Sequence, residues 1–141
     1  MREILFRGKP TKSNTSYFKD FVYGNLIINE DKYYICLNVN EHIKRDDYEV
    51  YMIEVISETI EQYTGLKDKN GVKIFEGDII KVCAEGLGGE AIGKIIYDEY
   101  DLAFVLRNEA EELSECLWYA NQQIEVIGNI HDNPNLLEEG E

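Results

Sequence analysis

The chain has 141 residues, of which 44% are apolar and 30% are charged, so it can bury a core without disulfide bridges and is too apolar to be intrinsically disordered. Acidic residues outnumber basic ones by 28 to 14, and residues 85–141 hold 14 acids against only Lys94 and Arg107, a net charge of −12. Because phosphate groups require a basic face, we expect no direct binding to nucleic acid.

The first part of the chain, residues 1–60, predicts a β-rich region of short strands. Runs of β-branched and aromatic residues alternate with polar or Gly/Pro-containing breaks, which is the pattern of strands joined by turns. Ser57–Thr59 could form a single helical turn. In chain order we expect a strand at 2–7, a hairpin of strands 17–28 and 33–37, a loop over 38–47, and one strand at 48–56.

Residues 61–132 predict a small, strongly bent β barrel, because several short strands are separated by tight turns. Asn70-Gly71 can supply the positive φ angles of a tight hairpin turn, and Glu76–Asp78 can form a second turn. The expected strands are 72–75, 79–83, 91–97, 102–106 and 124–130. A short amphipathic helix is expected within 108–123, and 133–141 is expected to be an acidic tail.

Motifs at the start, middle and end of the chain carry a family likeness. They are Met1–Gly8, then Gln62–Gly71 with Ile74–Ile80, and finally Glu125–Ile130 followed by Asn133–Leu137. In this order they resemble the signature of the YopX family of phage and prophage proteins. The residue patterns above predict a mostly β fold with little helix, and the resemblance implies that its C-terminal part is a barrel similar to SH3-type barrels, which we expect to pack with the N-terminal β-rich region. It also implies a phage or prophage origin and no particular activity.

The motif residues themselves have the chemistry of turns and are expected to be structural: Gly65, Leu66, Asp68, Asn70, Gly71, Gly77, Asp78, Gly128 and Asn129. A calcium loop over 66–77 is disfavoured, because the first and twelfth ligand positions fall on Leu66 and Gly77. The glycine-rich stretch 86–89 lies between Glu85 and Glu90 and lacks the Lys-Ser/Thr of a Walker loop, so it predicts a hairpin loop instead of a phosphate cradle.

Histidines and cysteines give no catalytic pattern. Neither His42 nor His131 shares a motif with a cysteine or serine, so we expect no catalytic residue, no metal ligand and no cofactor. Cys36, Cys83 and Cys116 are widely spaced and odd in number, which argues against a disulfide framework and favours a reducing compartment. No window approaches the roughly 18 apolar residues of a membrane span. We therefore expect a cytoplasmic protein, and the resemblance to phage proteins implies that its host cell is bacterial.

One set of acidic side chains is the candidate interaction face: Asp98, Glu99, Asp101, Glu109, Glu111, Glu112 and Glu115. Such clusters are most often solvated faces, and the ten tyrosines are expected mainly in sheet packing, with a protein interface as the second choice. Our first hypothesis is a non-enzymatic accessory protein that binds a protein partner or forms a homo-oligomer. An alternative is that the acidic residues mimic nucleic acid and occupy the basic cleft of another protein. A third is a carboxylate-dependent metal enzyme.

Overall fold

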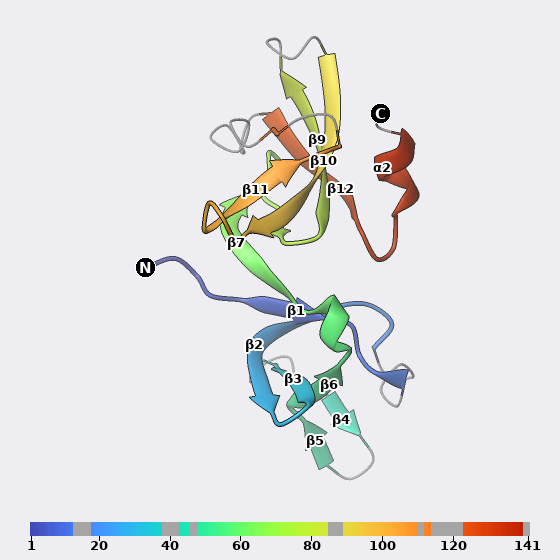
Figure 1. Cartoon of the computed structure of the whole chain (residues 1–141). Helices are drawn as coiled ribbons and strands as arrows, with labels where there is room; N and C mark the ends of the chain where they lie inside the picture. Colours follow the sequence, from blue (N-terminus) through green and yellow to red (C-terminus); the bar gives the residue numbers. More distant parts are fainter. Residues whose placement is uncertain are drawn as a thin grey trace. The chain divides into compact units, whose positions relative to one another are not determined.

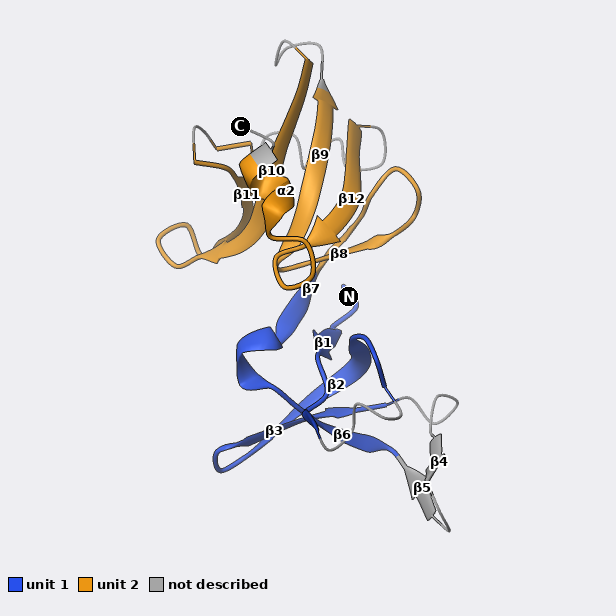
Figure 2. Cartoon of the chain, turned by 90° about the vertical axis from the view of Figure 1, so that its right-hand side faces the viewer, with its two compact units in different colours: residues 1–63 blue, residues 64–141 orange. Residues whose placement is uncertain are grey.

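The structure is a computed structural model, and it describes residues 1–12, 18–37, 43–45, 48–84, 89–109, 112–113 and 123–139 (Figure 1). The described residues are mostly β, with one 3-10 turn, η2 (Ser57–Thr59), and one short helix, α2 (Asn135–Glu139). The chain divides into two compact units, Met1–Tyr63 and Thr64–Glu141, which are described separately (Figure 2). The sequence-based boundary at residue 60 lies three residues before this division.

The first unit is a sheet that curls back on itself. Its strand order is β6-β3-β2-β1-β7. The strands are β1 (Phe6–Gly8), β2 (Val22–Asn29), β3 (Lys32–Cys36), β6 (Met52–Val55) and the start of β7 (Glu61–Lys67). While β1 pairs with β2, the residues directly after it bond to β6: the amide of Thr11 donates to the carbonyl of Glu54 (3.0 Å), and that of Ile56 donates to Lys9 (2.9 Å). One continuous stretch of chain therefore pairs first with β2 and then with the edge strand β6, which curls the sheet.

The core of the first unit follows from the alternation of side chains along its strands. Ile35 and Ile53 lie opposite each other on β3 and β6 and are fully buried. Val22, Leu37 and Val55 complete the buried cluster, against which Phe6 and other half-buried apolar side chains pack.

A glycine in β2 allows the close approach of strands in this unit. A Cβ atom built on Gly24 would lie 2.0 Å from the carbonyl oxygen of Cys36, which is backbone and cannot rotate away. We expect Gly24→Ala to lower the free energy of unfolding by about 3 kcal/mol, because the strands must separate to admit the methyl group. Chemical denaturation of this variant, with the exposed neighbour Asn25→Ala as a control expected to change stability by about 0.5 kcal/mol or less, measures this effect. Equal stability of both variants would contradict the clash.

The first unit differs from the sequence-based expectation in three places. The first strand begins at Phe6, because only Phe6–Gly8 find partners in β2. The predicted single strand over 48–56 is wrong: it is divided at Tyr51, since β5 (Tyr48–Val50) pairs with β4 (Ile43–Arg45) while β6 pairs with β3. The strand β4 lies where a loop was expected. Its sequence is Ile-Lys-Arg, in which only isoleucine is a residue type that favours strands, so composition did not indicate a strand.

The second unit contains a four-stranded antiparallel sheet in the order β11-β10-β9-β12. The strands are β9 (Asp78–Ala84), β10 (Gly89–Asp98), β11 (Ala103–Arg107) and β12 (Ile124–Asn129), and the end of β7 pairs with β8 (Lys73–Phe75). A bulge between Val126 and Gly128 bends β12. The buried core is aliphatic and draws on most of these strands: Ile74, Ile80, Val82, Ile95, Leu106, Leu113 and Ile124.

The turn after β7 is wider than the expected two-residue Asn-Gly hairpin. Among the described residues Gly71 has a positive φ (+81°) but Asn70 does not, so the turn is not of the type in which both residues are left-handed. The loop is instead shaped by the buried carboxylate of Asp68. Its Oδ1 accepts hydrogen bonds from the amides of Asn70 (2.8 Å) and Val72 (2.9 Å), and its Oδ2 accepts one from Val126 on β12 (2.9 Å).

The other motif residues also lie at turns. Gly77 has φ of +78°, and the buried Asp78 accepts a hydrogen bond from the amide of Phe75 (2.8 Å). Asn129 accepts hydrogen bonds from the amides of His131 and Asp132, both 3.0 Å, at the end of β12. Gly65 has φ of +94°, Leu66 is exposed, and a Cβ on Gly128 would lie 2.6 Å from the side chain of Asn133.

The C-terminal segment 133–141 was expected to be an acidic tail, but part of it is helical. Asn135–Glu139 forms α2, which lies beside β10. Pro134 directly before it has the φ angle of a first helical turn, and half-buried Leu136 and Leu137 give the helix an apolar side. The helix expected within 108–123 falls largely outside the described residues.

Candidate functional site

The turn between β10 and β11 is stabilised by hydrogen bonds to a carboxylate. Asp98 pairs with Ala103, so the loop consists of residues 99–102. Asp98 Oδ1 accepts hydrogen bonds from the amides of Tyr100 (2.8 Å) and Asp101 (3.1 Å), and its Oδ2 accepts one from Nη2 of Arg107 (2.9 Å). These bonds join the loop to the neighbouring strand, and we call residues 97–102 the β10–β11 tip.

The tip presents large apolar side chains to solvent. The exposed fractions are 99% for Tyr100, 75% for Leu102 and 46% for Tyr97. Leu102 has a φ of +52°, a region that a branched side chain adopts at a cost, whereas glycine or asparagine would adopt it readily. The ring of Tyr97 packs edge-on against Phe104 at a centroid distance of 5.5 Å, which supports the base of the tip. A strained, exposed leucine beside an exposed tyrosine has no evident role in the core of this unit.

The predicted acidic face is only partly assembled. Asp98, Glu99 and Asp101 belong to the tip, and Glu112 approaches it because Arg107 donates to both Asp98 and Glu112 (3.4 Å). Glu109 lies elsewhere, in the lining of a pocket beside α2. Glu111 and Glu115 lie outside the described residues. Of the acids that come together, Asp98 and Glu112 are bridged by the Arg107 guanidinium.

Other acids of the second unit are also paired. Glu125 lies 3.4 Å from Nζ of Lys69 and 3.9 Å from that of Lys81, and Glu90 lies 3.9 Å from Lys81. These pairs neutralise part of the negative charge of the unit. Mimicry of nucleic acid by the acidic residues stays a prediction.

Within the described ranges no group of three or more His, Cys, Asp or Glu side chains is arranged to hold a metal ion. Cys36 and Cys83 are free thiols, and His131 lies in the turn after β12, where its amide bonds to Asn129. His42 and Cys116 lie outside the described residues. Of the described helices, none is long and apolar enough to cross a membrane.

Sequence reasoning missed Tyr97, Tyr100 and Leu102 as candidate interaction residues. Tyrosines were expected mainly in sheet packing, and only the neighbouring acids of this segment were selected. The available signal was that Tyr100 stands inside a turn between acids, where an aromatic side chain cannot reach the core.

The hydrogen bonds to Asp98 predict a pH dependence of the tip. Backbone bonds from Asp101, the Arg107 guanidinium and a further bond from Tyr100 lower the pKa of Asp98 below its usual value. Because the folded-state pKa is depressed, this stabilisation is complete above the unfolded pKa of about 3.9 and is lost as the pH falls through the folded pKa. We expect amide exchange at Tyr100 and Asp101 to lose protection on acidification below about pH 4. In Asp98→Asn the amides of Tyr100 and Asp101 should be less protected from exchange than in the wild type. Their protection should also not change over the pH range in which Asp98 is protonated in the wild type. An unchanged pH profile in that variant would contradict the assignment.

The two units define the class of protein: a small two-part β protein with a curled sheet in one part and an antiparallel sheet in the other. The model of the family described as "YopX protein" matches residues 5–138, so the chain belongs to the YopX family. The chain is similar in structure to protein EF1440 from Enterococcus faecalis, known from a crystal structure, with a TM-score of 0.59, 25% sequence identity, and coverage of 97% of this chain and 99% of that one. No curated protein matches the chain.

Proposed function

We propose that this protein is a non-enzymatic binding module and that the β10–β11 tip is its contact surface for another protein. The observation that carries the proposal is the near-complete exposure of Tyr100 and Leu102 on a loop that Asp98 and Arg107 hold in place. Tyrosine is enriched at protein interfaces, where its ring fills a pocket and its hydroxyl finds a polar partner.

The fixed backbone of the tip favours binding. A loop that is already ordered loses less conformational entropy when it docks than a flexible one, so more of the contact energy contributes to affinity. The positive φ of Leu102 is consistent with such a role, since strained backbone angles cluster at ligand-binding sites and switch regions. The acids Glu99 and Asp101 beside Tyr100 favour a partner whose apolar pocket has a basic rim.

Affinity capture from bacterial lysate tests the proposal with three forms of the full chain. The wild type and Ile28→Ser, which removes an exposed isoleucine from the first unit, should retain the same protein. Tyr100→Ser/Leu102→Ser should retain it at least about tenfold less, because truncation of a hot-spot aromatic side chain costs about 2 kcal/mol or more of binding free energy. Equal far-UV circular dichroism and unfolding midpoints would show that the double variant is folded. Retention of the partner by this variant would contradict the proposal.

If the partner is a second copy of the chain, the wild type should sediment as an oligomer and the double variant as a monomer. We further propose, from family membership, a phage or prophage origin, action in the bacterial cytoplasm, and an SH3-like character for the barrel of residues 61–132. Its tight turns and short antiparallel strands support that last assignment.

A further inference from the structure

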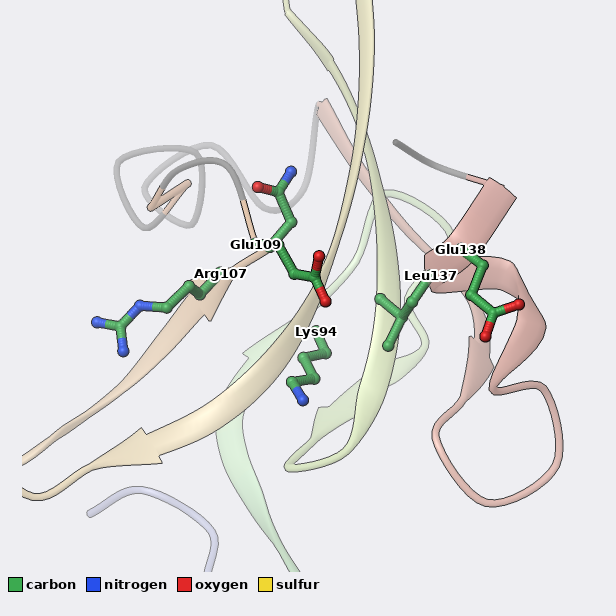
Figure 3. A pocket seen from close by; sticks show the side chains of 6 residues that line it. Lys94, Arg107, Glu109, Leu137 and Glu138 are labelled. Atoms are coloured by element: carbon green, nitrogen blue, oxygen red, sulfur yellow. The ribbon is translucent and has the colours of Figure 1, made fainter.

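A pocket of about 190 Å³ lies in the second unit, separate from the tip residues Tyr100 and Leu102. Strands β10 and β11, the two residues that follow β11, and helix α2 contribute its lining: Lys94, Arg107, Asn108, Glu109, Leu137 and Glu138. Figure 3 shows that the Glu109 and Leu137 side chains point toward one another, whereas the Arg107 guanidinium points away from them. That orientation agrees with the bonds from Arg107 to Asp98 and Glu112.

The charges of the lining are of both signs. Lys94 and Arg107 are the only basic residues in 85–141, and both fall on this pocket, as cross-strand partners on β10 and β11. Arg107 is engaged by the tip, but Lys94 makes no ion pair within 4.0 Å with any described carboxylate. Glu109 and Glu138 add negative charge to the same lining. The pocket therefore offers an ammonium, carboxylates and the apolar surface of Leu137 together.

The surrounding charge determines which ligand this arrangement suits. A simple anion that approached Lys94 would be repelled by a segment of net charge −12, and a simple cation would meet the Lys94 ammonium in the pocket. A zwitterion carries no net charge, yet its carboxylate can meet Lys94 while its ammonium meets Glu109 or Glu138. An apolar side chain on the ligand can then contact Leu137.

We propose that this pocket binds a small zwitterion with a short apolar side chain, of the free α-amino acid class. Its size agrees, because a cavity of about 150 Å³ accommodates benzene, and 190 Å³ accommodates a molecule somewhat larger. Asn108 contributes to the rigidity of the site, since its side-chain amide donates to the carbonyl of Ile92 (3.1 Å). This inference does not depend on the function proposed for the tip.

Titration of the full-length protein with L-leucine, followed by amide chemical shifts, tests the proposal. Two matched ligands each lack one charge: 4-methylpentanoate lacks the ammonium and 3-methylbutylamine lacks the carboxylate. We expect leucine to shift the amides of Lys94, Asn108 and Leu137 and to bind at least about tenfold more tightly than either analogue, because each charge-assisted bond contributes about this factor or more.

Variants of the protein separate the two charges of the site. Lys94→Met should weaken leucine binding about tenfold and leave the binding of 3-methylbutylamine, which has no carboxylate, unchanged. Glu109→Gln/Glu138→Gln should also weaken leucine binding about tenfold but leave the binding of 4-methylpentanoate, which has no ammonium, unchanged. Lys32→Met, which removes a lysine from the first unit, serves as the control and should bind leucine like the wild type. Absence of shifts with leucine, equal binding of leucine and either analogue, or unchanged leucine affinity in Lys94→Met would each overturn the proposal.

Discussion

Replacing Arg7 by methionine is expected to lower the free energy of unfolding of the first unit by about 4 kcal/mol, because it removes the guanidinium that forms an ion pair with a buried carboxylate. Arg7 on β1 and Glu61 on β7 are cross-strand neighbours whose side chains are each 6% exposed. Both Nε and Nη2 of Arg7 lie 2.9 Å from Oε1 of Glu61. The guanidinium also lies over the ring of Phe21, 4.2 Å from its centroid.

The pair should be strongly coupled. Glu61→Leu alone removes the carboxylate that accepts from this buried guanidinium and should also cost about 4 kcal/mol, whereas Arg7→Met/Glu61→Leu removes both charges and should cost about 3 kcal/mol less than the sum of the single variants. Amide hydrogen exchange of the full chain measures the effect on this unit. The partly exposed pair Lys69–Glu125 is the matched control, with an expected coupling of about 0.5 kcal/mol or less. Additive effects of the Arg7 and Glu61 substitutions would show that the buried charges are not coupled.

Removal of the Asp68 carboxylate should have a comparable effect on the second unit. Asp68 is 2% exposed, and Asp68→Ala deprives the amides of Asn70, Val72 and Val126 of their acceptor at once. Because bonds to a charged acceptor are worth more than neutral ones and a buried amide without a partner is costly, we expect a loss of about 4 kcal/mol in the free energy of unfolding.

Asp68→Asn separates the two roles of this side chain. Its remaining oxygen can still accept the two bonds within the loop, but an amide group in place of Oδ2 cannot accept from Val126, so the expected loss is about 2 kcal/mol. Urea denaturation gives the total, and hydrogen exchange at Val126 should report the selective loss in Asp68→Asn. The exposed Asp31→Ala is the control for removing a carboxylate. Wild-type stability of Asp68→Ala would mean that water replaces the carboxylate without cost.

The sequence allowed the family, the β-rich class and most of the strands of the second unit to be predicted. Strands such as Asp78–Ala84 and Ala103–Arg107 are runs of β-branched and aromatic residues between turn residues, and that local pattern suffices to identify them. The sequence did not show that Tyr48–Val55 is divided between two sheets, because the division depends on which strands lie beside it.

The candidate sites were predicted less well for a related reason. The acids of the tip were selected from their charge, but charge alone cannot show that Arg107 bridges Asp98 and Glu112 or that Glu109 lies in a different place. Tyr100 and Leu102 were missed because the type of an apolar residue does not show whether its side chain is buried or exposed in the folded protein.

Arg7 and Glu61 show the same limit most clearly, since 54 residues separate two charges that the fold buries together. By itself the sequence determined what is local: strand-forming runs, turn residues such as Gly71 and Gly77, and the excess of acidic residues. Only the tertiary structure decided what depends on distant partners: the buried ion pair, the three bonds to Asp68, the exposed tip and the pocket at Lys94. The physical reason is that propensity acts over neighbouring residues, whereas burial and pairing depend on which strands become neighbours in space.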